Sequence, residues 1–311
     1  MQKLIVLWVL LALTTGQARG QREPIAPLLT TEWGQQDPYN LLCPEFYYNS
    51  GRTEKCRAGC VAVSMAQVMN YYKYPSATQD KIAGYINLRI WMVGIIPHFA
   101  TLSDIQAGTP LDWTEMQDRY EGNETDSQRQ AVAQLMLCCG QSVMMKYDRS
   151  SSGSPYLIAS ALREKFGYPT SVRYVKREDY SDDEWEQLLY GELAAGRPVI
   201  YGGIKQDGGG HSFIIDGYEE PQLFHINWGS DGVANGYFPL NQLDPYRGDD
   251  GYNLSQDAII GLQPPTADNI SRLHTSHAEE TVYDMGGRRI DSSKGLRPGV
   301  YIVDGRKVIM K

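Results

Sequence analysis

Residues 57–75 read RAGCVAVSMAQVMNYYKYP and combine a helical pattern with a cysteine at its first turn. Apolar side chains recur at steps of three and four residues from Val61 to Tyr72, which predicts an amphipathic helix that starts at Cys60 and ends before Pro75. A thiol at a helix N-terminus faces unpaired N–H groups and the positive end of the helix dipole, and both favour the thiolate. Cys60 is therefore a candidate nucleophile, although burial as an inert free thiol is the commoner fate of such a residue.

Residues 206–229 read QDGGGHSFIIDGYEEPQLFHINWG and contain histidines that could act on this thiol. The two apolar runs predict a β-hairpin. If its turn is centred on Glu219, His211 lies opposite Asn227, whose amide can fix the tautomer and orientation of the ring. Trp228 can then shield this contact from water. Together with the thiol, these residue types reproduce a Cys-His-Asn arrangement for nucleophilic catalysis.

The spacing of the residues does not decide which histidine is the general base or which residue is the second oxyanion donor. His225 shares the alternation of its strand and rivals His211; its alternatives are a buried, hydrogen-bonded histidine or a surface residue on an edge strand. Acyl transfer also needs donors for an oxyanion, and the backbone N–H of Cys60 is one candidate. The upstream segment GQQDPYN offers Gln35 and Gln36 as the second, without favouring either over a polar turn residue.

The composition of the 311-residue chain narrows the function class. Hydrophobic residues make up 42%, charged residues 21%, and the formal net charge is −8, which is ordinary for a globular protein with a sizeable core. No basic cluster stands out, so nucleic acid is not an expected partner. No Cys/His spacing fits zinc and no phosphate-binding glycine motif opens a helix, so neither a metal nor an organic cofactor is expected.

The first twenty residues have the pattern of a signal peptide. Lys3 precedes the apolar run LIVLWVLLAL, and the segment ends in a small residue, Gly20. The run is too short to span a bilayer, so no stable membrane span is expected. The prediction is a mature chain that starts near Gln21 and is secreted or held at the cell surface.

Five cysteines leave at least one thiol unpaired if every disulfide is internal. In an exported protein an unpaired thiol is a liability unless it is buried or used. A Cys43–Cys56 disulfide stays open, since no motif supports it. Cys138 and Cys139 lie in the apolar run AVAQLMLCCG and are predicted to be core residues.

Predicted helices dominate the first part of the chain and predicted strands the second. Further helices are predicted at 126–146, 155–166 and 182–195. Short apolar strands follow one another from residue 197 onward. This segregation predicts an α+β fold and not an alternating α/β fold.

Four motifs, and the order in which they occur, resemble those of the streptopain-like family of cysteine peptidases. This family has a papain-like fold of two subdomains. The motifs are QQDPYNLLCP, GCVAVSMAQVMNYYKYP, GGGHSFIIDGY and FHINWG, and the resemblance runs from about Trp33 to Pro265. It implies Cys60 as nucleophile and His211 as general base. It further implies that Asn227 orients the histidine and that Gln35 supplies the oxyanion hole.

The resemblance also implies a substrate cleft. The loop SSSGSPY, residues 150–156, resembles the Ser/Gly loop of the family. Ser150 and Gly153 of this loop, together with Gly210 and Trp228, are the expected substrate-binding residues. The implied reaction is endopeptidase cleavage of proteins or peptides, with preference for an apolar side chain two positions before the cleaved bond.

Two departures from the family pattern affect the expectations. The family often has NWGWGG where this chain reads NWGSDG, so Ser230 replaces a tryptophan of the cleft wall and the shape of the subsites is expected to differ. A propeptide of ~100 residues, a common domain size, does not fit between Gly20 and Trp33. Latency through an N-terminal prodomain is therefore not expected, and control by a separate protein inhibitor, or no control, is consistent.

The C-terminal segment resembles the sorting domains recognised by the type IX secretion system. In it, VYIV and KVIM flank Asp304-Gly305, which predicts a hairpin; the alternative is a hairpin that only packs on the enzyme. The expected division is a signal peptide at 1–20, a papain-like catalytic domain at 21–265, and a linker with a β sorting segment at 266–311.

Two rival functions use the same residues. A catalytically silent relative could use the cleft for binding or adhesion, and papain-like folds also carry out acyl transfer with Cys and His. Silence is disfavoured because every polar catalytic role is filled in this sequence.

Overall fold

The computed structural model describes residues 22–246, 248 and 250–265, and the backbone of four short strands between 282 and 310. The predicted signal peptide and the linker at 266–281 lie outside the described residues. Within the described part, no helix has the length and apolarity that crossing a membrane requires.

Helix α1 (Cys60–Tyr72) is the centre of the structure, as its sequence pattern predicts. Every side chain from Val61 to Asn70 is buried, so the helix is enclosed on nearly all sides. Gly59 precedes it with φ 92°, and a Cβ at this position would lie 2.7 Å from the Met145 side chain. A glycine is therefore required where the chain turns into Cys60.

The helices predicted after α1 are confirmed, with ends a few residues inside the expected ranges. They are α2 (Asp126–Ser142), α3 (Leu157–Phe166) and α4 (Asp182–Ala194). Both α2 and α4 begin with a capping box, formed by Thr125 with Gln128 and by Ser181 with Glu184. These reciprocal bonds satisfy backbone donors at the helix starts, which fixes where the helices begin.

Six antiparallel strands form the main sheet, in the order β5-β10-β6-β7-β8-β9. Their bounds are β5 (Arg173–Lys176), β6 (Val199–Ile204), β7 (Gly210–Glu219), β8 (Leu223–Asn227), β9 (Gly236–Phe238) and β10 (Leu254–Ile260). A 3-10 turn, Arg177–Asp179, follows β5. Helices followed by an antiparallel sheet confirm the predicted α+β class.

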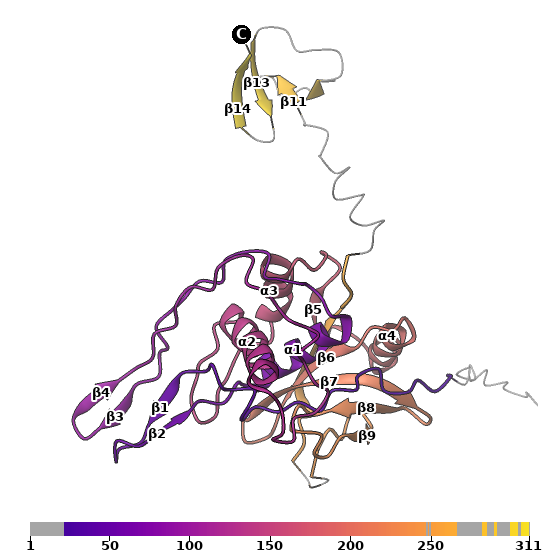
Figure 1. The fold of residues 1–311 in the computed structure, drawn as a ribbon. Helices are drawn as coiled ribbons and strands as arrows, with labels where there is room; N and C mark the ends of the chain where they lie inside the picture. Colours follow the sequence, from indigo (N-terminus) through magenta and orange to yellow (C-terminus); the bar gives the residue numbers. More distant parts are fainter. Residues whose placement is uncertain are drawn as a thin grey trace, which may run out of the picture.

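The sheet separates two hydrophobic cores because its side chains alternate between its faces. In β7, Ile214 joins the core that contains α1, α2 and α3, whereas Phe213 and Ile215 join the core that contains Trp185 of α4. Figure 1 accordingly shows α1, α2 and α3 grouped together and α4 apart from them. His211 is the second residue of β7, so a strand that is anchored in both cores brings it to the start of α1.

Short hairpins complete the described fold. They are β1 (Glu45–Tyr47) with β2 (Thr53–Lys55), and β3 (Trp91–Val93) with β4 (Ile96–His98). The rings of Tyr47 and Trp91 lie 6.3 Å apart, so the two hairpins pack side by side (Figure 1).

A four-stranded sheet of order β12-β11-β13-β14 lies in the C-terminal segment. Its strands are β11 (Val282–Asp284), β12 (Arg289–Ile290), β13 (Gly299–Val303) and β14 (Arg306–Met310). The pairing of Val303 with Arg306 leaves two residues for the turn, which confirms the predicted hairpin.

The predicted register of the β7–β8 hairpin is wrong. Asn227 pairs with Ile214, not with His211. Glu219 pairs with Leu223, so the turn is centred two residues later than expected, and a register shift between Ile215 and Gly217 moves the pairing back by one residue, so that Asn227 lies three residues from the predicted partner. Both are local backbone features that strand alternation does not reveal.

All five cysteines are free thiols in the structure. Cys138 and Cys139 have no exposed surface, which confirms their predicted place in the core. Cys43 and Cys56 are also buried and are not joined, so the disulfide that the sequence left open is absent. Burial raises the pKa of each of these two thiols to about 12.

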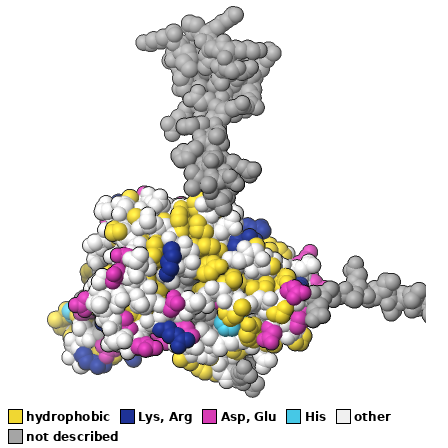
Figure 2. All heavy atoms as spheres, turned by 45° about the vertical axis from the view of Figure 1, so that its right-hand side comes forward, with side chains coloured by type: hydrophobic (Ala, Val, Ile, Leu, Met, Phe, Trp, Pro, Cys, Tyr) yellow, Lys and Arg dark blue, Asp and Glu magenta, His cyan; other side chains and the backbone are white. Residues whose placement is uncertain are grey.

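Charged side chains are mixed on the surface. On the face in Figure 2, Lys and Arg stand singly or in small groups among acidic and apolar side chains. That face therefore offers no continuous basic surface.

Candidate active site

The thiol of Cys60 lies at the start of α1 and is hydrogen-bonded to the ring of His211. Burial by itself would raise the pKa of this thiol. The bond and charge of His211, with backbone N–H groups of Ser212 and Val61, outweigh that effect, so the pKa lies below its ordinary value of 9.0. The site therefore favours the thiolate, as expected for a thiol at a helix N-terminus.

The imidazole of His211 is held between this thiol and the carbonyl of Trp228. Its Nε2 lies 2.9 Å from that carbonyl oxygen, which can only accept, so Nε2 carries a proton and Nδ1 faces Cys60. Burial and the charge of Lys205 lower the pKa of the ring, but the bond and charge of Cys60 and the Trp228 carbonyl raise it above its ordinary value. A lowered thiol pKa beside a raised imidazole pKa favours a thiolate–imidazolium pair.

A buried hydrogen bond fixes the helix and the strand that carry these two groups. The hydroxyls of Ser64 and Ser212 lie 2.8 Å apart. Ser64 is one helical turn after Cys60, and Ser212 follows His211 directly. The bond therefore restricts sliding of α1 along β7, which would separate the thiol from the ring.

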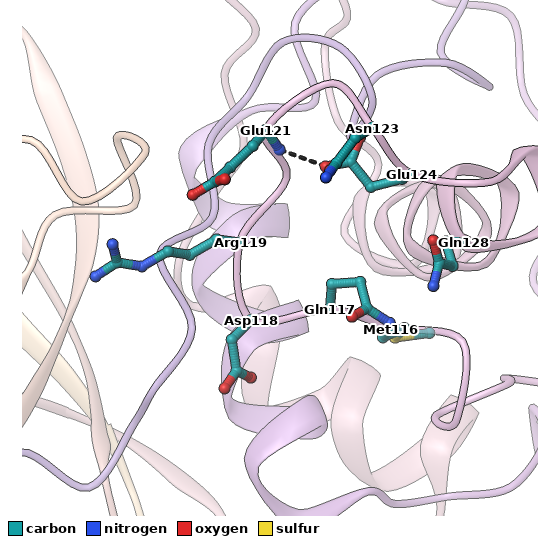
Figure 3. A pocket seen from close by; sticks show the side chains of 8 residues that line it. All are labelled: Met116, Gln117, Asp118, Arg119, Glu121, Asn123, Glu124 and Gln128. Atoms are coloured by element: carbon teal, nitrogen blue, oxygen red, sulfur yellow. Dashed lines mark hydrogen bonds between the residues drawn. The ribbon is translucent and has the colours of Figure 1, made fainter.

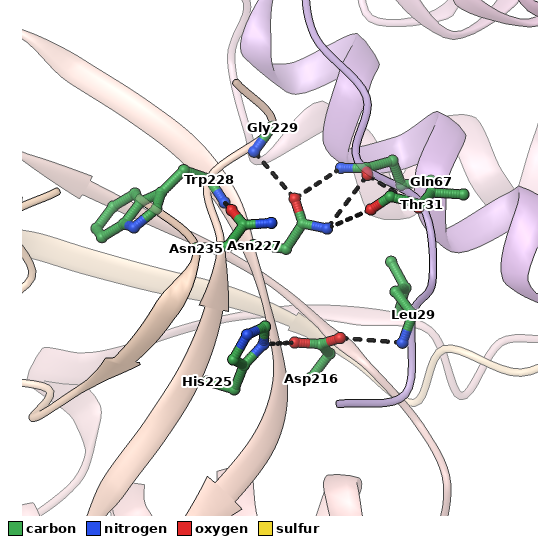
Figure 4. Close-up of polar contacts among 9 residues, drawn as sticks. All are labelled: Leu29, Thr31, Gln67, Asp216, His225, Asn227, Trp228, Gly229 and Asn235. Carbon is green, nitrogen blue, oxygen red and sulfur yellow. Dashed lines mark hydrogen bonds and ion pairs between the residues drawn. The ribbon is translucent and has the colours of Figure 1, made fainter. Parts of the chain in front are cut away.

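The predicted register placed Asn227 opposite His211, where its amide would bond to the ring. In the structure the amide bonds to other groups. Its Nδ2 donates to the Thr31 carbonyl at 2.7 Å, and its Oδ1 accepts from Gln67 at 3.3 Å and from the N–H of Gly229 at 3.1 Å (Figure 4). These bonds tie the N-terminal segment, α1 and the end of β8 together. Asn227 thereby acts on His211 only indirectly, by fixing the backbone that presents the neighbouring Trp228 carbonyl.

Sequence reasoning missed Gln67, which is central to this network. Its side chain is completely buried, and its Oε1 accepts from the Thr31 hydroxyl at 2.9 Å. One feature of the sequence could have identified Gln67: it is a glutamine on an otherwise apolar helix face, two turns after Cys60. A buried amide needs partners, but the sequence does not reveal which ones.

Trp228 forms the wall behind His211. The two rings are stacked with centroids 6.2 Å apart, and Phe213 packs 4.7 Å from the indole. Only 1% of Trp228 is exposed, so the expected contact between its side chain and substrate does not fit this conformation. The half-buried ring of Tyr252, 5.1 Å from His211, covers the same cluster and was not identified from the sequence.

The structure brings the backbone of Gln35 close to the start of α1. Its carbonyl accepts from the N–H of Ala58 at 3.0 Å, two residues before Cys60, and the residue is half-buried. Gln36 is exposed, and its carbonyl accepts from Asn40. This placement favours Gln35 over Gln36 as the candidate oxyanion donor.

The Ser/Gly loop packs against the first turn of α1. A Cβ at Gly153 would lie 3.4 Å from Val61, whereas Ser150 is exposed, as is Gly210 at the start of β7. Ser151, which the sequence did not single out, donates to the Arg57 carbonyl at 2.6 Å. The loop is thus bonded to the chain that enters Cys60.

His225, the rival base, belongs to a separate contact. Its Nδ1 lies 2.6 Å from Oδ1 of Asp216, whose other oxygen accepts from the N–H of Leu29 at 3.0 Å (Figure 4). Asp216 has no exposed surface. Of its alternatives, the hydrogen-bonded histidine agrees best with the structure, in which the ring is half-buried and not fully buried.

Two cavities lie outside the contacts of Cys60 and His211. One, of about 670 Å³, is lined by mostly polar residues between Met116 and Gln128 (Figure 3). Another, of about 400 Å³, includes Gly153, Met145 and Tyr156 and adjoins the Ser/Gly loop. Among the described side chains, no group of three or more His, Cys, Asp and Glu is arranged to hold a metal ion.

Comparisons with known proteins agree with this geometry. The family model described as "Peptidase C10 family" matches residues 33–238. Streptopain from Streptococcus pyogenes is 33% identical over 246 residues, which cover 75% of this chain and 60% of that protein. The thiol protease/hemagglutinin PrtT of Porphyromonas gingivalis is 34% identical over 255 residues, or 77% of this chain and 28% of that protein.

A solved structure shows the same fold. Active wild-type interpain A cysteine protease of Prevotella intermedia superimposes with a TM-score of 0.66 and 34% identity, covering 76% of this chain and 94% of that one. The papain-like fold is thereby confirmed. Although the chain spans only 60% of the length of the streptopains it matches, the family model covers most of it. The chain therefore belongs to the Peptidase C10 family.

Proposed function

We propose that this protein is a cysteine endopeptidase whose nucleophile is Cys60 and whose general base and acid is His211. The observation that carries the proposal is the hydrogen bond between the thiol and the imidazole, with opposite shifts in their pKa values. Membership of the Peptidase C10 family and likeness to interpain A support the same reaction.

In the proposed mechanism, the Cys60 thiolate attacks the scissile carbonyl carbon and forms a C–S bond. The carbonyl electron pair moves onto oxygen, where the Cys60 N–H and the Gln35 amide hold the charge. His211 donates its Nδ1 proton to the leaving amine as the C–N bond breaks. It then takes a proton from water, which attacks the thioester, releases the acid and restores the thiolate.

The remaining parts of the chain have proposed roles that follow from this reaction. Residues 1–20 direct export, 21–265 form the catalytic domain, and 266–311 serve sorting to the cell surface, which the signal-like start and the terminal β-segment support. Substrates are proteins or peptides with an apolar side chain two positions before the cleaved bond. A separate protein inhibitor would be a means of control.

The test is digestion of casein and of a peptide library by the wild-type protein and by Cys60→Ala. We expect internal cleavage by the wild type and none by the variant. Labelling of Cys60 by a thiol blocker without any peptide turnover would favour acyl transfer or binding instead.

A further inference from the structure

The turn after β8 carries a carboxylate next to the segment of Gln35. The backbone N–H of Asp231 donates to the Trp33 carbonyl at 3.2 Å. Its side chain lies over Gly34, where a Cβ would approach one carboxylate oxygen to 2.2 Å. Since Gly34 directly precedes Gln35, this carboxylate borders the candidate oxyanion site.

Hydrogen bonds hold the backbone of the turn that carries the carboxylate. The N–H of Trp228 donates to the Asn235 side chain at 2.9 Å, and the N–H of Val233 donates to the Ser230 carbonyl at 2.9 Å. Asp231 itself has φ 55°, a left-handed conformation that Asp and Asn tolerate better than most residues. The backbone that carries the charge is therefore held by hydrogen bonds.

Asp231 is exposed as a residue, although partial burial raises the pKa of its carboxylate and only the charge of Arg57 opposes this effect. Among the described residues Asp231 takes part in no ion pair, and Arg57 is the cation whose charge acts on it. The neighbouring Glu32, which a Cβ at Gly232 would approach to 2.4 Å, is already paired with Arg119 at 2.5 Å. Asp231 is thus the acidic group of this turn that is left for a ligand.

The proposed reaction indicates which half of a peptide substrate Asp231 would meet. The acyl group stays on Cys60, whereas the leaving amine receives its proton from His211, whose ring is bonded to the Trp228 carbonyl. Asp231 lies three residues beyond Trp228 in the chain, in the turn whose carboxylate lies over Gly34. The turn that carries this carboxylate therefore follows directly on the carbonyl that holds the proton donor of the leaving amine.

Building on the proposed peptidase function, we propose that Asp231 determines specificity by favouring a Lys or Arg side chain at the first or second position after the cleaved bond. An exposed cation–carboxylate contact of good geometry gives roughly a three- to fivefold preference. Where the related motif has glycine at this position, NWGWGG, that carboxylate is missing; here NWGSDG supplies it.

The test compares paired peptides that differ only by Lys or Gln at these two positions. We expect the wild type to have the higher kcat/KM on the Lys peptides, and Asp231→Asn, which keeps the turn geometry, to bring the Lys/Gln ratio to about one without loss on the Gln peptides. Added salt should reduce the wild-type ratio, because it screens exposed charges. Glu164→Gln, which removes an exposed charge from α3, is the matched control and should leave the ratio unchanged.

Three outcomes would overturn the inference. An equal Lys/Gln ratio in the wild type and Asp231→Asn excludes a role for the charge. An equal loss by Asp231→Asn on both peptides assigns Asp231 to turn structure alone. In either of these two cases, cleavage that depends on Cys60 leaves the proposed function intact. The third outcome, absence of all peptide cleavage by the wild type, removes both proposals.

Discussion

Ser64 and Ser212 share a buried 2.8 Å hydrogen bond that joins α1 to β7 beside the Cys60–His211 contact. The Ser64 hydroxyl also lies 3.1 Å from the Val61 carbonyl, to which it donates. Ser64 therefore accepts the proton of Ser212, and the pair has a defined direction. Cys60 lies one helical turn before Ser64 and His211 directly precedes Ser212, so the bond couples stability to the geometry of the site.

Replacing one member of this pair should cost more than replacing both. Ser64→Ala leaves the buried hydroxyl of Ser212 without its acceptor, and we expect a loss of about 1–3 kcal/mol in the free energy of unfolding. The double variant Ser64→Ala/Ser212→Ala should lose less than the sum of the single losses. Urea unfolding of the four proteins measures this coupling. Strictly additive losses would mean that the two hydroxyls do not interact.

The pH dependence of the thiol should follow from the opposite pKa shifts. The thiolate persists below the ordinary thiol value of 9.0, and the imidazolium persists above the ordinary value of 6.5. The ion pair therefore exists between the two pKa values: kcat/KM falls on the acidic side as Cys60 is protonated and on the alkaline side as His211 loses its proton.

Alkylation of Cys60 measured against pH isolates the thiol half of this prediction. In His211→Ala the main lowering effect is gone and burial dominates, so the midpoint of alkylation should move to higher pH. Unfolding measured in parallel shows that the variant is folded. A midpoint that is the same in both proteins would contradict the contact between the two side chains.

The periodicity of the sequence was enough to predict the four helices and the strands from β6 onward, because each follows from residues close together in the chain, whereas the short strands β1 to β5 were not predicted. The start of α1 at Cys60 depends on a glycine beside it, and the alternation in β7 follows from its own side chains. The register of β7 with β8 depended instead on where the turn is centred and on the shift after Ile215. A small change in backbone geometry moved Asn227 three residues away from the position opposite His211.

The polar partners of the site were not predictable for a different reason. Asn227 bonds to Gln67 and Thr31, which lie 160 and 196 residues away in the sequence. No periodic pattern connects such positions. The resemblance to a known family identified Asn227 as important, but only the packed structure reveals that its amide holds the backbone and leaves the ring of His211 to the Trp228 carbonyl.

Asn227 and Gln67 should therefore behave as one structural unit. Asn227→Ala removes partners from Gln67, Thr31 and Gly229, and we expect it to lower the free energy of unfolding by about 2–3 kcal/mol. Gln67→Ala should give a similar loss, and the double variant should be far from additive. Because neither side chain bonds the ring of His211, the pH midpoint of Cys60 alkylation should stay close to that of the wild type. A large shift of this midpoint in Asn227→Ala alone would indicate direct contact with the ring.

His225 should contribute to stability and not to chemistry. His225→Ala removes one of the two partners of the buried Asp216 carboxylate, which keeps the Leu29 N–H, so the free energy of unfolding should fall by about 1–3 kcal/mol. The folded fraction should keep its peptidase activity and its Cys60 alkylation profile, whereas His211→Ala should lose activity while remaining folded. Loss of activity in folded His225→Ala, with full activity in His211→Ala, would exchange the two assignments.

The turn that leads into Cys60 should not tolerate a side chain at position 59. Gly59→Ala forces a residue with Cβ to adopt φ 92° and places that atom 2.7 Å from Met145, so we expect a loss of at least about 2 kcal/mol in the free energy of unfolding, together with lower activity. Gly191→Ala is the matched control, because Gly191 lies within α4 and a Cβ there meets nothing within 4 Å. This second variant should be more stable than the wild type by about 0.5–1 kcal/mol, since alanine replaces glycine in a helix interior. Urea midpoints that move in opposite directions for the two substitutions would support the tight turn before the proposed nucleophile, and an unchanged midpoint for Gly59→Ala would contradict it.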